Sequence, residues 1–151
     1  MKVKVKKLHP DAKLPVYSTE GSACFDISAL ELDNIPSMSG RQLFTDDTTV
    51  IRTGLSFEVP KDHVMLVFSR SGHGFKENVR LSNCVGVIDS DYRGELMVKL
   101  IKDAPSHNTL INKGDRIAQA MIIPVQQVQF ELVNELSDTT RGTNGLGSTG
   151  V

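Results

Sequence analysis

The residues best suited to chemistry lie in one segment, 81–95, which reads LSNCVGVIDSDYRGE. Apolar residues lead into Asp89, Asp91 follows, and a tight Tyr-Arg-Gly turn occupies 92–94. A carboxylate at the point where an apolar strand becomes a turn lies between the buried interior and solvent. In that environment it can accept a proton from water. Either carboxylate could instead cap the turn by accepting hydrogen bonds from nearby backbone N–H groups. The local sequence leaves both roles open.

Two other segments carry groups that bind phosphate. Residues 69–72 (SRSG) follow an apolar strand, so Arg70 and Ser71 lie at a strand end where donors can face a ligand. Residues 114–119 (GDRIAQ) open another strand. Each signal is weak alone, because an arginine beside a turn is usually a solvated surface charge. Neither of these two segments matches the GxxxxGKS/T phosphate loop of common nucleotide-binding α/β folds.

The last eleven residues, 141–151, contain four glycines and little that a core could bury. Such a composition is typical of a disordered tail. The same segment could be a mobile flap that closes over a phosphate, because glycines let backbone N–H groups approach oxygens closely. Ser148 and Thr149 would add hydroxyl groups, and Arg141 a bidentate cation. Both interpretations stay open at this point.

Strands are the elements that must position these groups, because the dominant hydrophobic period along the chain is two. Strict alternation of apolar and polar residues predicts strands at 2–7, 95–100 and 127–132. The runs 63–68 and 117–123 are more continuously apolar, which is typical of strands buried on both faces.

Helix is nearly absent from the pattern. No window of a dozen residues is convincingly amphipathic, and at most a turn or two is expected after Ser71, around 75–79. Residues 30–47 are the least regular part and are expected to form a surface excursion. Many short strands separated by turn residues are typical of an all-β sandwich or jelly roll.

Length, charge and cysteine usage narrow the possible classes of protein. At 151 residues the chain is long enough for one domain with its own core. Its formal net charge of −1 provides no general attraction to nucleic acid or membranes, so a polyanionic ligand must be held by a local site. Cys24 and Cys84 lack CxxC spacing and are expected to be small buried hydrophobes in a reducing compartment. Residues 1–10 lack the apolar core of a signal peptide, and we expect a soluble cytoplasmic protein.

Five short segments, in this order, together resemble the motifs of the homotrimeric dUTP pyrophosphatases (dUTPases). They are 23–29 (ACFDISA), 69–72 (SRSG), 86–95 (GVIDSDYRGE), 114–119 (GDRIAQ) and 141–150 (RGTNGLGSTG). The resemblance spans nearly the whole chain and is weakest over 30–47. Two positions depart from the family pattern: Ser69 stands where proline is usual, and Leu146 where an aromatic residue is usual.

The resemblance implies a jelly-roll catalytic domain over residues 1–136 and a flexible phosphate-binding tail over 137–151. It implies a homotrimer with active sites at the subunit interfaces, and hydrolysis of dUTP to dUMP and pyrophosphate. That reaction limits uracil in DNA and supplies dUMP for thymidylate synthesis. The implied cofactor is Mg²⁺, held mainly by substrate phosphates and water, with no direct protein ligand. Neither nucleic acid nor a membrane is an expected partner.

Carried over by position, the resemblance also implies individual roles. Asp89 would be catalytic, orienting and deprotonating the water that attacks the α-phosphorus. Tyr92 would pack against the deoxyribose and leave no space for a 2′-hydroxyl, while the hairpin at 83–97 would receive uracil. Asp26 would support the site by holding neighbours such as Arg70 or water. The implied substrate-binding residues are Arg70, Ser71, Gly72, Asn83, Val87, Ile88, Asp89, Tyr92, Met97, Gln119, Arg141, Leu146, Gly147 and Ser148.

Under this resemblance, Leu146 would contact the uracil base in place of the usual aromatic residue. It would cover the base by apolar contact but without stacking, which is worth on the order of 1–3 kcal/mol for base–aromatic contacts. We therefore expect weaker tail closure than in a relative with Phe. Arg141 and Ser148 would still grip the γ-phosphate.

Two other functions compete with this interpretation. A dCTP deaminase would share the fold, the trimer and the phosphate grip, but it needs a glutamate to shuttle protons at the base. The pattern from Asp89 to Tyr92 fits the hydrolase better. A non-catalytic trimer that binds dUTP or a protein partner as a regulator is the second alternative. The intact Asp89 argues against loss of catalysis but not against an added binding role, for which 30–47 is the expected surface.

Overall fold

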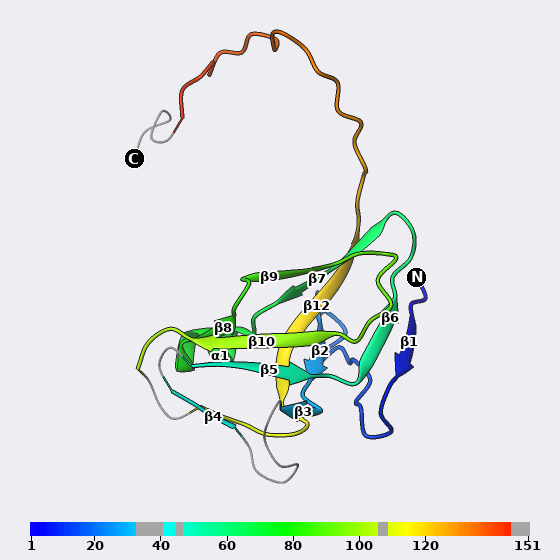
Figure 1. The fold of residues 1–151 in the computed structure, drawn as a ribbon, viewed down its shortest axis with the longest axis vertical. Coiled ribbons are helices and arrows are strands. Elements are labelled where there is room, and N and C mark those ends of the chain that lie inside the picture. The colour runs from blue at the N-terminus through cyan, green and yellow to red at the C-terminus, as the bar shows by residue number, and fades with distance from the viewer. Residues whose placement is uncertain (33–40, 45–46, 106–108, 146–151) are drawn as a thin grey trace.

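A computed structural model describes residues 1–32, 41–44, 47–105 and 109–145 of the chain (Figure 1). Within these ranges strands dominate, and one short helix, α1 (Ser71–Glu77), interrupts them. The strands are β1 (Lys4–Lys7), β2 (Phe25–Ser28), β3 (Glu31–Leu32), β4 (Arg41–Leu43), β5 (Thr48–Arg52), β6 (Leu55–Glu58), β7 (His63–Phe68), β8 (Val79–Leu81), β9 (Val85–Ile88), β10 (Met97–Lys102), β11 (Thr109–Ile111) and β12 (Arg116–Pro124). None of the helical structure in these ranges is long and apolar enough to cross a membrane.

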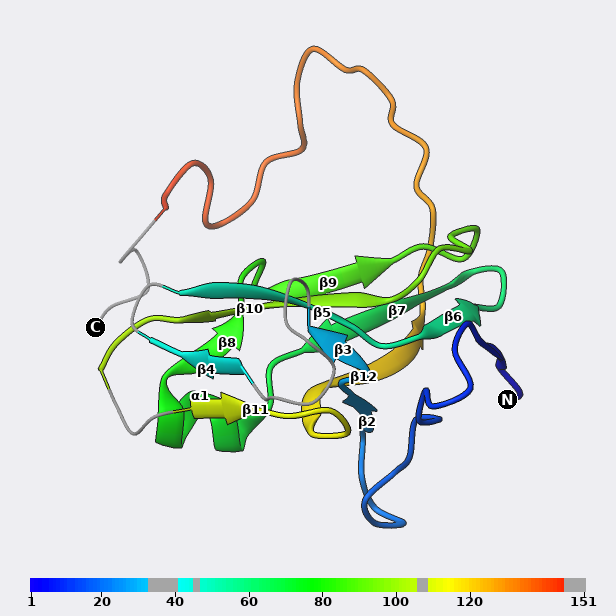
Figure 2. The same cartoon turned by 60° about the horizontal axis from the view of Figure 1, so that its bottom comes forward.

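Two four-stranded sheets form the body of the molecule (Figures 1 and 2). Their strand orders are β2-β12-β7-β9 and β3-β5-β10-β8, and two smaller pairs, β1-β6 and β11-β4, complete the described sheets. Every strand pair in the described part of the chain is antiparallel. The expected all-β, jelly-roll-like fold is therefore confirmed.

One hydrophobic cluster draws side chains from both four-stranded sheets. Ile27 and Met65 enter it from one sheet, and Ile51 and Leu100 from the other, all fully buried. Each such side chain contributes roughly 1.5–3 kcal/mol to folding through the apolar surface it removes from water. The shared core holds the two sheets, and hence the loops at their ends, in one arrangement.

The predicted period of two is confirmed in the strands that matter for the site. In β10, Val98 and Leu100 are buried whereas Met97 and Lys99 are exposed, as the alternation requires. Strand β7 occupies the predicted residues 63–68, but only one of its faces is buried; the other is half-buried. The predicted turn or two of helix is α1, which begins at Ser71 and ends where Asn78 adopts φ 54°.

Two predictions about secondary structure are wrong. The alternating residues 127–132 form no strand: the chain leaves the body after Pro124 and runs as an extended arm (Figure 1). Phe130 and Leu132 are 94% and 99% exposed there, because no sheet edge within the described chain pairs with them. Residues 30–47 are more than a surface excursion, since they contribute β3 and β4, and Leu43 is fully buried. Residues 33–40 and 45–46 lie outside the described ranges.

The prediction for the cysteines is also wrong in part. Cys84 is exposed, because it lies in the turn between β8 and β9 with φ 63°. Its Sγ accepts a contact of 3.7 Å from Nη1 of Arg80. Cys24 is half-buried, and burial together with the charge of Asp26 raises the pKa of its thiol.

Candidate active site

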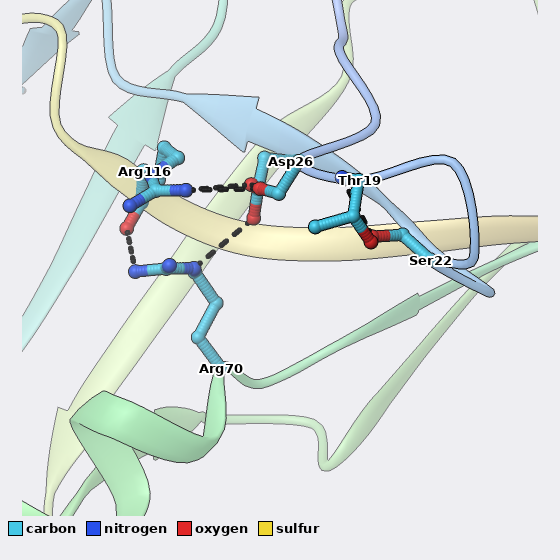
Figure 3. Close-up of polar contacts among 6 residues, drawn as sticks. Thr19, Ser22, Asp26, Arg70 and Arg116 are labelled. Atoms are coloured by element: carbon cyan, nitrogen blue, oxygen red, sulfur yellow. Dashed lines mark hydrogen bonds and ion pairs between the residues drawn. The ribbon is translucent and has the colours of Figure 1, made fainter.

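Two arginines converge on the buried carboxylate of Asp26 (Figure 3). Nε of Arg70 lies 3.2 Å from Oδ1, and Nη1 of Arg116 lies 3.1 Å from Oδ2. The hydroxyl of Ser18 donates to Oδ2 at 2.7 Å. Nη1 of Arg70 also donates to the backbone carbonyl of Arg116 at 3.1 Å, which ties the two cations together. Asp26 and Arg70 are thus in direct contact, which is the arrangement that the predicted supporting role of Asp26 needs.

Sheet order brings these residues together from distant parts of the chain. Gln119 on β12 is in register with Asp26 on β2 and with Phe68 on β7. Arg116 begins β12, and Arg70 lies two residues beyond the end of β7, so all three groups lie near one end of adjacent strands. Nε2 of Gln119 donates to the carbonyl of Ser69 at 3.0 Å and holds the loop that carries Arg70.

The cluster has a surplus of positive charge. Burial would raise the pKa of Asp26, but hydrogen bonds from Ser18 and Arg116 and the charges of Arg70 and Arg116 lower it overall. One ionised carboxylate therefore faces two guanidinium groups. Within the described chain, Nη2 of Arg70 has no hydrogen-bond partner. The arrangement can bind an anion, and Ser71 and Gly72 lie exposed beside it at the start of α1.

A second region is a largely apolar cleft of about 440 Å³ along β9 and β10. It includes four residues that the sequence assigned to uracil, namely Asn83, Val87, Ile88 and Met97. The remaining lining residues are Val50, Val67, Leu81, Ser82, Gly86, Leu96, Val98 and Lys99. Its size and its few polar groups suit a small planar ligand.

Asp89 and Tyr92 share a smaller hollow of about 200 Å³ that adjoins this cleft, with Val87, Ile88 and Met97 in both. The carboxylate of Asp89 is exposed and accepts no hydrogen bond from any described residue. The turn is closed instead by the backbone: N–H of Tyr92 donates to the carbonyl of Asp89 at 3.2 Å. A turn-capping role for the Asp89 side chain therefore has no support in this geometry, and the carboxylate is free to act on a ligand or water.

Hydrogen bonds connect the turn that contains Tyr92 to residues 52–56. The Tyr92 hydroxyl donates to the carbonyl of Glu95 at 3.0 Å. The Glu95 carboxylate accepts bonds of 2.9 and 2.7 Å from Nε and Nη2 of Arg52, and one of 2.7 Å from N–H of Gly54. Ser56 donates to the carbonyl of Arg93 at 2.7 Å. These contacts hold the ring in one place.

The described chain does not bring the arginine cluster to Asp89. In the order β2-β12-β7-β9, Asp26 lies on one edge strand and Asp89 follows the opposite edge strand. Along β7 the register pairs Ile88 with Met65 and Val85 with Phe68, so Asp89 lies toward the end of β7 remote from Arg70. The strand from 64 to 68 alone spans about 13 Å. Asp89 and the arginine cluster of one chain therefore lie apart along the direction of β7.

Arg141 lies on the C-terminal arm that follows β12 and is exposed. Its guanidinium donates to the backbone carbonyls of Asn144 and Gly145 at 3.1 and 3.3 Å. Leu146, Gly147 and Ser148 lie outside the described residues. Among the described residues no group of three or more His, Cys, Asp or Glu side chains is placed to hold a metal ion.

Three residues that organise these two regions were not predicted from the sequence. Arg116 stood in the GDRIAQ segment but was not counted among the site residues, although its guanidinium is the second partner of Asp26. Glu95 and Arg52 anchor the Tyr92 turn through a pair 43 residues apart. The acidic end of GVIDSDYRGE was the available signal for Glu95, whereas nothing near Arg52 in the sequence indicates its partner.

Comparisons relate the chain to proteins of known activity. A family model described as dUTPase matches residues 10–150. A deoxyuridine 5′-triphosphate nucleotidohydrolase of Nautilia profundicola is 44% identical over 150 residues, covering 99% of both chains. The solved dUTPase of Staphylococcus bacteriophage 80alpha with dUPNHPP has a TM-score of 0.82 at 26% identity, covering 99% of both chains. A mutant dUTPase from phage phi11 of S. aureus, whose structure reveals the coordination of a structural Mg(II) ion, has a TM-score of 0.74 at 23% identity, covering 89% of this chain and 98% of its own.

Proposed function

The chain belongs to the dUTPase family, and we propose that it hydrolyses dUTP to dUMP and pyrophosphate with a water activated by Asp89. The observation that carries this mechanism is the unpaired, exposed carboxylate of Asp89, which shares a hollow with Tyr92 beside the apolar cleft. A general base must be free to accept a proton and close to the reacting group. The Asp89 carboxylate is free to accept a proton, and a nucleotide bound in the hollow would bring the reacting phosphate close to it.

In the proposed step, Asp89 orients a water molecule and accepts a proton as the water oxygen attacks the α-phosphorus. The bond from that phosphorus to the α,β-bridging oxygen breaks, and its electron pair leaves with pyrophosphate. The product dUMP keeps the new oxygen on its phosphate. Because a triphosphate repels an anionic nucleophile, cations must offset its charge while the water reacts.

Arg70 is the principal cation of this scheme, with Ser71, Gly72 and Gln119 as its companions at the phosphates. The two guanidinium groups around Asp26 support this assignment, since they leave a surplus of positive charge. We propose Mg²⁺ as the cofactor, bound through phosphate oxygens and water because Mg²⁺ retains several of its waters. When bound, it supplies further positive charge to the phosphates.

The cleft along β9 and β10 is the proposed uracil site, with Asn83, Val87, Ile88 and Met97 in its lining. Rigid backbone groups of this hairpin would pair with the edge of uracil, and cytosine, with its reversed donors and acceptors, would leave buried groups unpaired. Tyr92 is 43% exposed and fastened at Glu95, so a ring face is available for deoxyribose. A 2′-hydroxyl would collide with that ring.

We propose that the protein is a homotrimer, and the separation of the two regions supports assembly from several copies. Because Asp89 lies near the start of β7 and Arg70 lies beyond its end, we propose that each active site combines the hairpin of one copy with the cluster of another. The exposed apolar residues of the arm, Phe130 and Leu132 among them, support burial against a further copy.

Residues 1–136 then form the catalytic domain and 137–151 the closing tail. Arg141, with Leu146, Gly147 and Ser148 beyond the described residues, would cover the bound nucleotide. We place the enzyme in the cytoplasm, where it would limit uracil incorporation into DNA and supply dUMP. Neither nucleic acid nor membrane is required as a partner.

The decisive assay measures pyrophosphate release from dUTP, dCTP, dTTP and UTP in the presence of Mg²⁺. We expect release from dUTP alone, and loss of that release in Asp89→Asn with dUTP binding retained. Ammonia release from dCTP without pyrophosphate would establish a deaminase instead. Unchanged turnover in Asp89→Asn would overturn the proposed activation of water.

A further inference from the structure

Position 94 has room only for glycine because the side chain of Tyr92 lies against it, and not because of its backbone conformation. A Cβ atom built on Gly94 would lie 2.3 Å from Oη, 2.5 Å from Cζ and 2.9 Å from Cε2 of Tyr92. All three of the atoms nearest to this Cβ thus belong to one side chain. The φ of Gly94 is not positive, so the backbone conformation is open to L-residues. Non-bonded carbon atoms prefer separations of about 3.5–4.0 Å, so a side chain at 94 would displace the ring.

A hydrogen bond to Glu95 holds the Tyr92 ring close to Gly94. Its hydroxyl donates to the Glu95 carbonyl at 3.0 Å, and the Glu95 carboxylate is fixed by Arg52 and by the N–H of Gly54. This attachment draws the phenol across the turn and over the bare Cα of Gly94. In that place the ring borders the hollow it shares with Asp89.

We propose that Gly94 is a specificity-determining position, because its missing side chain lets Tyr92 occupy the place that excludes ribose. The inference rests on the proposed function, in which the Tyr92 ring meets the sugar. Gly94 acts only through that ring and is a positioning residue. Alanine at 94 would push the ring away from the turn and alter the space beside the sugar, so that a 2′-hydroxyl is admitted.

Steady-state kinetics of Gly94→Ala with dUTP and UTP test the inference. The ratio of kcat/KM for dUTP to that for UTP should fall by on the order of tenfold or more, because a displacement of about 1 Å in a positioning group has effects of this size or larger. Gly21→Ala is the matched control, since a Cβ there meets no atom within 4 Å. Its selectivity should equal that of the wild type.

Tyrosine fluorescence provides a measurement that does not depend on activity, because the chain has few fluorescent residues. The chain has two tyrosines and no tryptophan, so Tyr17→Phe leaves Tyr92 as the only tyrosine. In that background, quenching of tyrosine fluorescence by acrylamide should increase when Gly94→Ala is added, because the ring moves outward. An unchanged quenching constant would contradict the inference.

A stability cycle keeps the inference testable if Gly94→Ala alone folds poorly. We expect Gly94→Ala to lower the Tm of the wild type but not that of Tyr92→Ala, since the three nearest clashing atoms are then gone. An equal loss of Tm in both backgrounds would overturn the steric explanation.

The outcomes also separate this inference from the proposed function. If Tyr92→Ala lowers the preference for dUTP but a folded Gly94→Ala does not, the inference on Gly94 fails and the role of Tyr92 stands. If neither variant lowers the preference, both the sugar contact of Tyr92 and this inference fail. Absence of pyrophosphate release from dUTP by the wild-type trimer would overturn the function itself.

Discussion

The carboxylate of Asp26 accepts a 3.2 Å hydrogen bond from Nε of Arg70, and this contact bridges three adjacent strands of one sheet. Asp26 lies on β2, Arg70 follows β7, and β12 runs between them. The contact fixes the cationic cluster beyond the end of β7, whereas β9 leads into Asp89 near the start of β7. The cation and the proposed base of one chain therefore lie toward opposite ends of β7.

Mixing of inactive subunits tests this division. Arg70→Ala and Asp89→Asn should each be inactive alone, but trimers assembled from an equal mixture should recover about a quarter of wild-type activity, because one interface in four joins an intact Arg70 to an intact Asp89. Pyrophosphate release after dissociation and reassembly is the measurement. No recovery in trimers shown to contain both subunits would place the whole site within one chain.

Asp26→Asn should weaken both the phosphate site and the fold. Asn removes the negative charge that orients Arg70 and Arg116, so KM for dUTP should rise and the free energy of unfolding should fall by about 1–3 kcal/mol. Urea unfolding and steady-state kinetics measure the two effects. Asp11→Asn is the control: its pair with Lys113 is solvent-exposed, and both quantities should stay at the wild-type value.

His73 should make the stability of the protein depend on pH near neutrality. Burial lowers the pKa of His73 below its usual value of 6.5, and Nδ1 has no hydrogen-bond partner in the described part of the chain. Below pH 6.5 the unfolded chain takes up a proton that folded His73 resists, so stability is present above that pH and declines as the pH falls through the folded pKa.

Urea unfolding at pH 7.5 and at pH 5.5 measures this decline. His73→Gln should lose less stability over the interval than the wild type, because glutamine does not titrate. Equal losses in the two proteins would show that His73 does not carry the dependence.

Glu95→Gln should loosen the turn that holds Tyr92. The Glu95 carboxylate is paired with Arg52 in a largely buried position, so its neutralisation should cost about 1–3 kcal/mol of unfolding free energy. The preference for dUTP over UTP should fall with it, since the ring loses its anchor. As a control, Glu58→Gln breaks an exposed pair with Lys4 and should leave both stability and selectivity intact.

Leu146→Phe should strengthen closure of the tail over the nucleotide. A phenyl ring can stack on uracil, and base–aromatic stacking is worth on the order of 1–3 kcal/mol. KM for dUTP should fall or kcat should rise in Leu146→Phe, as measured by pyrophosphate release. No gain in either constant would contradict the expected stacking.

Local patterns predicted much of the fold. Strand β7 begins and ends at the predicted residues 63–68, and the turn containing Asp89 and Tyr92 lies where the sequence indicated. Both follow from interactions among residues close in the chain, namely side-chain alternation and turn chemistry. Residues 127–132 have the same alternation but form no strand, because a strand also needs a partner edge, which lies far away in sequence.

The sequence by itself determined the family, through five ordered motifs, and the chemical identity of the groups at the site, including Asp89 and Arg70. Only the tertiary structure decided which of them meet. It joined Arg116 to Asp26, 90 residues apart, and it placed Asp89 and Arg70 toward opposite ends of β7. It also placed Tyr92 so close to Gly94 that a Cβ atom there would lie 2.3 Å from Oη of the tyrosine. Side-chain type is written residue by residue, whereas distance between side chains depends on strand order and register, which the packing of the whole core sets.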